Sequence, residues 1–197
     1  MTEQNLIETW IADLDSDEIL IRQSAIDNLL AAAAGAVEPL IAAMQRQKGR
    51  QAWEAAAILA QIDDPRWIQP MKNMLMASNL IIASIAAATL ERFGESVVGT
   101  FIDALPKCRA MTQMQIVGIL ERIGDRRCVD LLMDLLSTAD SADFQYTIIQ
   151  TLGALGDARA AELIRSFQHH ENHHIRKRAQ AALRRLESQS SSSDHSS

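Results

Sequence analysis

The chain has 197 residues, enough for one domain with a substantial core, and its formal net charge is −6. Apolar residues make up 48% of it and aromatic residues only 4%, with few Gly and Pro, and this composition favours helices over strands. A net negative charge argues against a general nucleic-acid binder, which would carry a basic patch. No apolar stretch reaches the roughly 20 residues of a membrane span. We therefore expect no nucleic-acid partner and no membrane span.

Helices are expected in pairs along the chain, because two columns of residues recur about every 30 positions. The Leu column comprises Leu29, Leu59, Leu90, Leu120, Leu152 and Leu183. Four residues before each member stands the Ala/Ile column, which comprises Ala25, Ala55, Ala86, Ile116, Ile148 and Ala179. An offset of four places both columns on one face of a helix. Six copies in register indicate a repeat protein.

Each pair consists of a first helix with large apolar residues and a second helix that carries the two columns. In chain order we expect first helices near 4–14, 36–47, 66–77, 95–105, 126–138 and 158–169. Second helices are expected near 18–33, 50–62, 79–93, 109–123, 141–155 and 172–187. One such hairpin cannot bury its apolar faces alone, so neighbouring hairpins must stack.

The predicted fold class is therefore all-α, a right-handed α-solenoid of about six helical hairpins over residues 1–187. The repeats are expected near 4–33, 36–62, 65–93, 95–123, 126–155 and 158–187. Residues 188–197 have no apolar side chain to pack, and we expect a disordered, Ser-rich tail. The ends differ in charge: residues 1–30 hold seven acids and one Arg, whereas residues 159–187 hold seven bases and three acids.

Short motifs identify the kind of repeat. The second helices of the end repeats begin Ile21-Arg22-Gln23-Ser24-Ala25 and Ile175-Arg176-Lys177-Arg178-Ala179, and two junctions read Gly124-Asp125-Arg126-Arg127 and Gly156-Asp157-Ala158-Arg159. This pattern resembles the short bacterial HEAT-like repeat of the PBS-lyase type, named after bilin lyase subunits of phycobilisomes. The resemblance covers roughly residues 5–187 and implies a HEAT-type solenoid that acts as an adaptor. The central repeats lack the Arg, so any role of that residue applies only to Arg22 and Arg176.

The resemblance also reaches the deoxyhypusine hydroxylases, HEAT-repeat enzymes that bind iron through His-Glu pairs in several repeats. This chain has one such pair, His170-Glu171, in a predicted turn. His169 and His173, like His170 and His174, have a spacing that suits a metal on one helix face, but the turn favours a solvated polar segment. The sequence has no Ser-His-Asp set, Gly-rich phosphate loop or zinc-spaced Cys group. We expect no enzymatic activity, catalytic residue, metal or cofactor.

Two cysteines, Cys108 and Cys128, are too few for a disulfide framework and fit a reducing compartment. The first residues also lack the pattern of a signal peptide, so we expect a cytoplasmic protein. Lys107 and Arg109 flank Cys108 and could lower its pKa, although a surface thiol without reactivity is the expectation we favour. Cys128 is expected to be partly buried.

Counting six residues back from the Leu column defines a helix face turned away from the core: Gln23, Trp53, Ser84, Met114, Tyr146 and Lys177. Counting two back gives Asp27, Ala57, Ala88, Gly118, Gln150 and Ala181. We expect this face on the concave side, where exposed aromatic residues and Met over small residues are typical of a protein interface. The predicted site for a protein or peptide partner comprises Trp53, Ser84, Met114, Gly118, Tyr146, Gln150, Arg22, Arg176 and Lys177.

Two alternatives remain open at this point. Trp53 could instead fold onto a neighbouring helix, and Met114 could be part of the core. We expect Trp10 and Trp67, which lie in first helices, in the core. The rival function is that of a phycobilisome-related bilin lyase accessory subunit or chaperone-like factor. A groove for a linear tetrapyrrole would need an acid and a base that converge, and only Asp27 and Arg22 offer that combination, at one end.

Overall fold

The computed structural model describes residues 2–46, 49–77 and 80–193, and within these ranges the regular elements are all helical. The chain divides into two compact units, Met1–Phe93 and Gly94–Ser197, and each contains three of the predicted repeats. The predicted all-α class and the helical hairpins are confirmed in both units. We describe each unit by itself.

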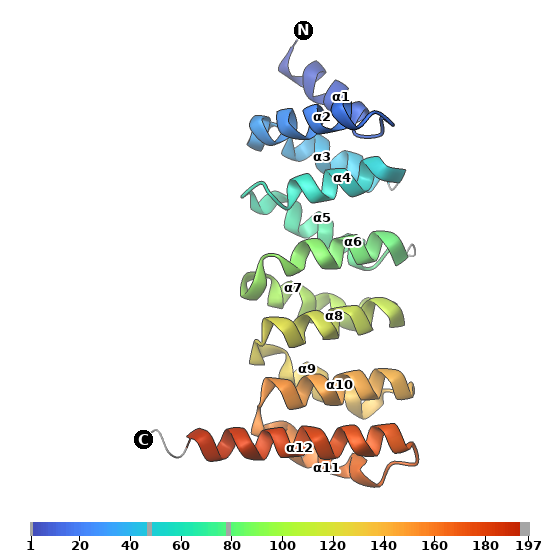
Figure 1. Ribbon diagram of the computed structural model, residues 1–197, viewed down its shortest axis with the longest axis vertical. Coiled ribbons are helices and arrows are strands. Elements are labelled where there is room, and N and C mark those ends of the chain that lie inside the picture. The colour runs from blue at the N-terminus through green and yellow to red at the C-terminus, as the bar shows by residue number, and fades with distance from the viewer. Residues whose placement is uncertain (1, 47–48, 78–79, 194–197) are drawn as a thin grey trace. The chain divides into compact units, whose positions relative to one another are not determined.

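In the first unit the first and second helices alternate along the chain. The first helices are α1 (Glu3–Asp13), α3 (Val37–Gln45) and α5 (Ile68–Leu75), and the second helices are α2 (Ile19–Ala32), α4 (Gly49–Leu59) and α6 (Leu80–Glu91). The turns η1 (Ala33–Gly35) and η2 (Pro65–Trp67) precede α3 and α5. Figure 1 shows α2, α4 and α6 side by side, so the second helices of this unit form one continuous face.

The second unit repeats this arrangement. Its first helices are α7 (Val98–Ala104), α9 (Val129–Thr138) and α11 (Ala161–Ser166), and its second helices are α8 (Ala110–Ile123), α10 (Ala142–Leu155) and α12 (His173–Ser193). Single 3-10 turns flank the first helices at Gly94–Val97, Leu105–Lys107, Arg126–Cys128, Ala158–Ala160 and Phe167–His169. These turns take up the ends of the predicted first helices, which are therefore shorter than expected. Helices α8, α10 and α12 lie side by side (Figure 1).

The two predicted columns form the cores of the units. Every residue of the Leu column and the Ala/Ile column is buried, and the most exposed member, Leu183, shows only 6% of its surface. Gly124 and Gly156 end α8 and α10 with φ of 77° and 67°, a left-handed conformation that Gly adopts without a steric penalty. The repeat read from the sequence therefore corresponds to the packing repeat.

An Asp and an Arg two residues apart connect successive repeats at three junctions. Asp64, Asp125 and Asp157 each accept the backbone N–H of the second residue on, which caps the 3-10 turn, and each also pairs with that residue's guanidinium. The Arg then reaches one repeat back: Arg66 to the Ala34 carbonyl, Arg127 to the Glu95 carbonyl and Arg159 to the Asp130 carboxylate. We call this arrangement the Asp-x-Arg link.

The second helices approach most closely where small residues meet. Gly153 on α10 faces Ala182 on α12, and a Cβ added at Gly153 would lie 2.6 Å from the Cβ and 2.8 Å from the Cα of Ala182. Contact between real carbon atoms requires about 3.5 Å or more. The separation of α10 and α12 therefore depends on the absence of a side chain at position 153.

The expected disordered tail is wrong for part of its length. Helix α12 continues to Ser193, so residues 188–193 are helical, whereas residues 194–197 lie outside the described residues. Leu186, seven residues before the end of α12, is the last buried residue among the side chains that the structure describes in this helix. Extending an existing helix adds one hydrogen bond for each residue that is fixed, so a polar sequence suffices there.

No single helix in the described ranges is long and apolar enough to cross a membrane. One bent pair, Ile19–Gly35 with Val37–Gln45, meets the length and composition criteria at an angle of 117°. Leu29, Val37 and Leu40 of this pair are fully buried in the first unit.

Candidate partner-binding surface

Trp53 stands at the edge of a hollow between α4 and α6 in the first unit. Its side chain is 51% exposed, although it is one of the largest apolar side chains in the chain. The hollow is lined by Trp53, Ala57, Ala60, Ile85, Ala88, Thr89 and Arg92. Ala57 and Ala88 are two of the small residues that the sequence placed on this face. Trp53 is therefore not part of the buried core.

Ser84 lies on α6 and is half-buried, one residue before Ile85 of the same hollow. Its register position matches that of Trp53 on α4, because both stand six residues before a member of the Leu column. The first unit therefore brings Trp53 and the small residues of α6 to one surface, as predicted. We call the surface formed by the second helices within each unit the second-helix face.

Met114 and Gly118 lie on α8 in the second unit and are both half-buried. Gly118 has open space around it, since the nearest atom to an added Cβ would be Arg122 Nη1 at 3.7 Å. Ile116 and Val117, between them in sequence, are fully buried and hold the helix on the core. Met114 is thus placed at the border of the second-helix face and the core, between the two alternatives considered from the sequence.

Tyr146 and Gln150 lie one turn apart on α10, and each is held by a neighbour. The guanidinium carbon of Arg178, on α12, lies 4.1 Å from the centroid of the Tyr146 ring, a cation–π contact. Gln150 Nε2 donates to both carboxylate oxygens of Glu121 on α8, at 3.1 and 3.0 Å, and Thr151 Oγ1 also donates to Glu121. These contacts fix the polar groups of α8, α10 and α12 on one surface.

Arg22 and Arg176 have a structural function that the sequence did not reveal. Arg22 Nη1 donates to the Ser16 carbonyl at 2.6 Å, and Arg176 Nη1 donates to the carbonyls of His170 and Glu171 at 2.7 and 2.8 Å. Both guanidinium groups hold the turn between the first and second helix of their own repeat. Both guanidinium groups thus use part of their hydrogen-bonding capacity within their own repeat. Lys177, in contrast, is exposed on α12.

In two central repeats a Gln donates to the turn in place of this Arg. Gln113 and Gln145 occupy the position of that Arg, and their Nε2 atoms donate to the carbonyls of Leu105 and Ala139 at 3.0 and 2.7 Å. A long side-chain donor at this position therefore donates to a carbonyl of the inter-helix turn.

Asp27 and Arg22, the pair considered for a tetrapyrrole, are engaged with different partners. Asp27 Oδ1 accepts from Gln23 Nε2 at 3.0 Å, whereas Arg22 donates to the turn carbonyl described above. In the described part of the first unit the two side chains do not form the converging acid and base that a tetrapyrrole groove would need.

His169 and His170 lie in the turn before α12, as predicted. His170 Nδ1 accepts the backbone N–H of Asn172, and the His170 ring stacks on Phe167. His173 and His174 begin the helix, and Lys177 is the main cause of a lowered pKa at His173. Among the described residues no group of three or more His, Cys, Asp or Glu side chains is arranged to hold a metal ion.

Both cysteines are free thiols and both are buried. The expectation of a surface position for Cys108 is wrong, since only 8% of it is exposed, and burial raises its pKa. Cys128 is fully buried, its Sγ donates to the Asp125 carbonyl, and burial raises its pKa to about 11. Position 108 directly follows the 3-10 turn Leu105–Lys107, in which Leu105 is fully buried in the core.

Exposed apolar residues at the start of the second helices were missed from the sequence. Leu20 on α2, Ile81 on α6 and Met111 on α8 are 84%, 71% and 60% exposed. Each stands nine residues before a member of the Leu column, a register that would have identified them. Trp10, expected in the core, is only half-buried and lines a hollow with Leu20 and Ile21. Trp67 is buried as expected.

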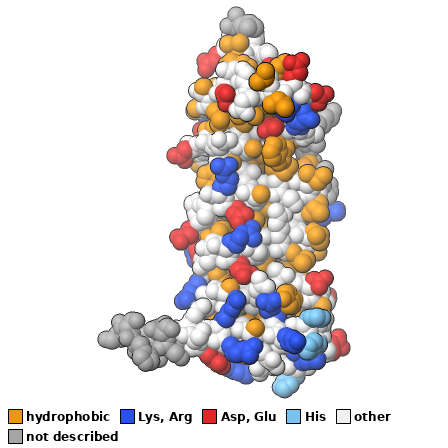
Figure 2. All heavy atoms as spheres, in the orientation of Figure 1, with side chains coloured by type: hydrophobic (Ala, Val, Ile, Leu, Met, Phe, Trp, Pro, Cys, Tyr) orange, Lys and Arg blue, Asp and Glu red, His pale blue; other side chains and the backbone are white. Residues whose placement is uncertain are grey.

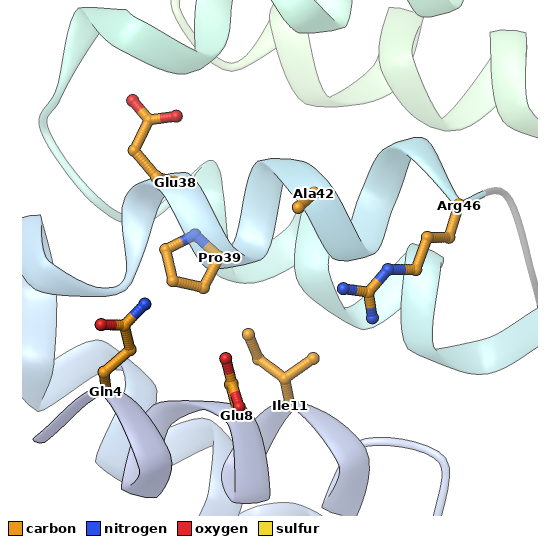
Figure 3. A pocket seen from close by; sticks show the side chains of 7 residues that line it. All are labelled: Gln4, Glu8, Ile11, Glu38, Pro39, Ala42 and Arg46. Carbon is orange, nitrogen blue, oxygen red and sulfur yellow. The ribbon is translucent and has the colours of Figure 1, made fainter. Parts of the chain in front are cut away.

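A second hollow lies between the first helices α1 and α3. Figure 3 shows Gln4, Glu8 and Ile11 of α1 on one side of the hollow, and on the other Pro39 of α3 and Arg46 at its end. Glu38 and Ala42 of α3 complete the lining. Its lining combines two carboxylates, one guanidinium and small apolar groups. Glu38 is also near Arg66, at 3.6 Å from Nη1. The hollow is a gap between two polar helix surfaces, and it lacks the exposed aromatic anchor of the second-helix face.

Stacked helical hairpins with a continuous face of second helices define the α-solenoid class of repeat protein. Residues 98–184 match the family described as HEAT repeats, so the predicted resemblance to HEAT-like repeats is confirmed. The match lies within the second unit, and the first unit has the same order of hairpins. No curated protein matches the sequence.

Solved structures of similar fold belong to proteins of different kinds. A designed armadillo repeat protein in complex with the peptide (KR)4 is 16% identical, with 91% of this chain and 99% of that chain covered, at a TM-score of 0.53. Human deoxyhypusine hydroxylase in complex with glycerol is 15% identical, with 92% and 84% covered, at 0.54. The complex of CpcE and CpcF of phycocyanin lyase from Nostoc sp. is 17% identical, with 91% and 94% covered, at 0.39. The first two show a shared fold, and the third supports no argument.

Proposed function

We propose that this protein is a scaffold without catalytic activity that binds a segment of a protein partner on its second-helix face. The observation that carries the proposal is Trp53, 51% exposed beside a hollow lined by Ala57, Ala60 and Ala88. A large aromatic side chain at the edge of a shallow apolar hollow is typical of the residues that dominate the binding free energy of protein interfaces. A partner that covers this ring removes its apolar surface from water, which favours binding.

The second unit contributes a more polar surface to the proposal. Met114, Tyr146 and Gln150 lie on the second helices, and the Arg178–Tyr146 and Gln150–Glu121 contacts hold this surface in one arrangement. A surface that is ordered before binding loses less side-chain entropy when a partner docks. Lys177 adds an exposed positive charge beside it. We propose these side chains as further partner contacts.

A fold analogy supports a protein partner, and the cysteines bear on the compartment. The designed armadillo repeat protein of similar fold holds a peptide, which is an analogy at the level of the fold. The free thiols of Cys108 and Cys128 fit a reducing compartment, and we propose the cytoplasm as the site of action. The role proposed for Arg22 and Arg176 is narrower than the sequence suggested, because both hold turns.

A displayed library of random peptides, selected on the full chain, tests the proposal and requires no identified partner. Binding of selected peptides is then measured by titration calorimetry on Trp53→Ala and on Met76→Ala. Met76 is the matched control, an exposed apolar residue that ends the first helix α5 and is 38% exposed. We expect Trp53→Ala to weaken binding by about 2 kcal/mol or more and Met76→Ala to have little effect.

Tyr146→Ala extends the test to the second unit, with thermal unfolding as the check that each variant is folded. Peptides that bind the wild type and the Trp53 and Tyr146 variants equally would contradict the proposal. The working surface would then be elsewhere, for example on the exposed residues Leu20 and Ile81.

A further inference from the structure

The last helix carries a row of positive side chains on the second-helix face. His173, Lys177, Ala181 and Arg185 are spaced four residues apart, so they lie along one side of α12. His173, Lys177 and Arg185 are all exposed. Figure 2 shows Lys, Arg and His side chains gathered over the C-terminal repeat on the face turned to the viewer. We call this set the basic row.

Arg178 extends the basic row toward α10. Its contact with the Tyr146 ring, at 4.1 Å, holds the guanidinium beside α10. Arg176 does not belong to the row, because it donates to the turn carbonyls of His170 and Glu171. The positive charge thus spans two helices, on side chains that a partner can reach.

Positive charge outweighs negative charge at this surface. The pKa of His173 lies below its usual value, chiefly because of the Lys177 charge, with burial, Arg176 and His174 as smaller causes. The acids nearest in sequence, Glu171 and Glu187, stand at the two ends of the row, and Asp143 lies at the start of α10. Glu121, on α8, already accepts hydrogen bonds from Gln150 and Thr151. Lys177, Arg178 and Arg185 have no carboxylate between them in the sequence, and such a group of cations attracts an anionic partner.

We propose that the basic row binds an acidic, extended segment of a partner protein, an inference that rests on the proposed scaffold function. The row from His173 to Arg185 spans 12 residues of helix, about 18 Å at 1.5 Å per residue. An extended peptide of about five or six residues covers that length, at roughly 3.3 Å per residue. Two or three carboxylates at alternate positions would then meet His173, Lys177 and Arg185.

A protein segment fits the surface better than nucleic acid. Proteins that bind single strands offer aromatic faces on which bases stack. The Tyr146 ring, which adjoins the basic row, has Arg178 over it, and the His170 ring stacks on Phe167. These rings are therefore engaged, while carboxylates need only the exposed positive groups.

Fluorescence anisotropy with a labelled hexaglutamate peptide and the full chain tests the inference. A hexaglutamine peptide of equal length and a labelled single-stranded oligonucleotide are the comparison probes. We expect hexaglutamate to bind, with an affinity that falls as salt rises, and hexaglutamine to bind at least tenfold more weakly. Lys177→Glu and Arg185→Glu should each weaken hexaglutamate binding at least tenfold. Lys107→Glu, an exposed charge of the same unit outside the row, should change it less than twofold.

Three results would overturn the inference. These are equal binding of the two peptides, equal loss of affinity in Lys107→Glu and Lys177→Glu, or tighter binding of the oligonucleotide than of hexaglutamate. The nuclear magnetic resonance titration of His173 gives an independent readout, since bound carboxylates should raise its pKa toward or above the usual value. A His173 pKa that does not change with saturating hexaglutamate contradicts contact with the row. Failure of hexaglutamate leaves the scaffold proposal intact, because the latter depends on library-selected peptides and Trp53.

Discussion

The guanidinium of Arg127 donates a 2.6 Å hydrogen bond to the backbone carbonyl of Glu95, 32 residues earlier in the chain. Asp125 holds the same guanidinium at 2.8 Å and caps the turn that contains Arg127. The pair therefore joins the starts of two successive repeats in the second unit. Asp64 and Arg66 do the same in the first unit, toward the Ala34 carbonyl.

Removing the Asp of one Asp-x-Arg link should lower the free energy of unfolding, whereas removing the adjacent Asp outside the link should not. Asp64 caps η2 and pairs with Arg66, whereas Asp63 is exposed and is its direct neighbour. We expect Asp64→Ala to lower the free energy of unfolding by about 1 kcal/mol, the typical cost of a lost cap. Asp63→Ala should stay within about 0.5 kcal/mol of the wild type. Urea denaturation at neutral pH compares them, and equal effects of the two changes would show that the link adds nothing.

The same links predict the acid sensitivity of the fold. The pKa values of Asp64, Asp125 and Asp157 lie below the usual 3.8, chiefly because each accepts hydrogen bonds from an Arg side chain. As pH falls, these groups take up protons in the unfolded state first, so their stabilisation is present above pH 3.8 and is lost progressively below it. Denaturation at several pH values should show a steep loss of stability in acid. A triple Asp→Asn variant should lose less stability over that range than the wild type, and an unchanged slope would contradict the assignment.

Two glycines on neighbouring second helices should respond to the same substitution with opposite signs. Gly153→Ala would place a Cβ 2.6 Å from that of Ala182, and the overpacking should cost about 1–3 kcal/mol. At Gly118 the nearest atom to a new Cβ is 3.7 Å away, so Gly118→Ala should stabilise α8 by about 0.5–1 kcal/mol through helix propensity. Chemical denaturation measures both. A neutral or stabilising Gly153→Ala would show that α10 and α12 separate easily.

The Leu column and the exposed start of α2 offer a matched pair of Leu→Ala changes. Leu120 is fully buried and Leu20 is 84% exposed. Leu120→Ala should cost roughly 2–5 kcal/mol, the range for buried large-to-small changes. Leu20→Ala should stay within about 0.5 kcal/mol of the wild type. Thermal and chemical unfolding report both values, and a cost below about 0.5 kcal/mol for Leu120→Ala would refute its place in the core.

The buried thiols should resist alkylation in the native protein. Cys128 has a pKa raised to about 11 and is fully buried, and the pKa of Cys108 is raised as well, so little reactive thiolate forms at neutral pH. Iodoacetamide should label both residues slowly without denaturant and rapidly in urea, as followed by mass spectrometry. Rapid labelling of native Cys108 would instead support the alternative in which Lys107 and Arg109 activate its thiol.

Periodicity made the fold predictable from the sequence, because the Leu and Ala/Ile columns record which side of each second helix is buried. It also placed Trp53 on the second-helix face, since a residue six positions before a buried Leu lies about 120° around the helix from it. The same counting could not predict the position of Met114, because a side chain at the border can turn toward core or solvent. The hydrogen bonds of Arg22 and Arg176 to their turns were equally invisible, since backbone carbonyls leave no signature in the sequence. The helical extension of α12 to Ser193 follows from the preceding part of the same helix rather than from local composition.

In two of the three Asp-x-Arg links, the acceptor is a backbone carbonyl, at Ala34 and at Glu95. Every amino acid supplies such a carbonyl, so the side chains at these two positions are free to diverge among related proteins without loss of the link. Position 130 differs, because Arg159 there reaches a carboxylate. Natural variants should therefore accept many residues at 34 and 95, keep the Asp and Arg of each junction, and retain an acid at 130.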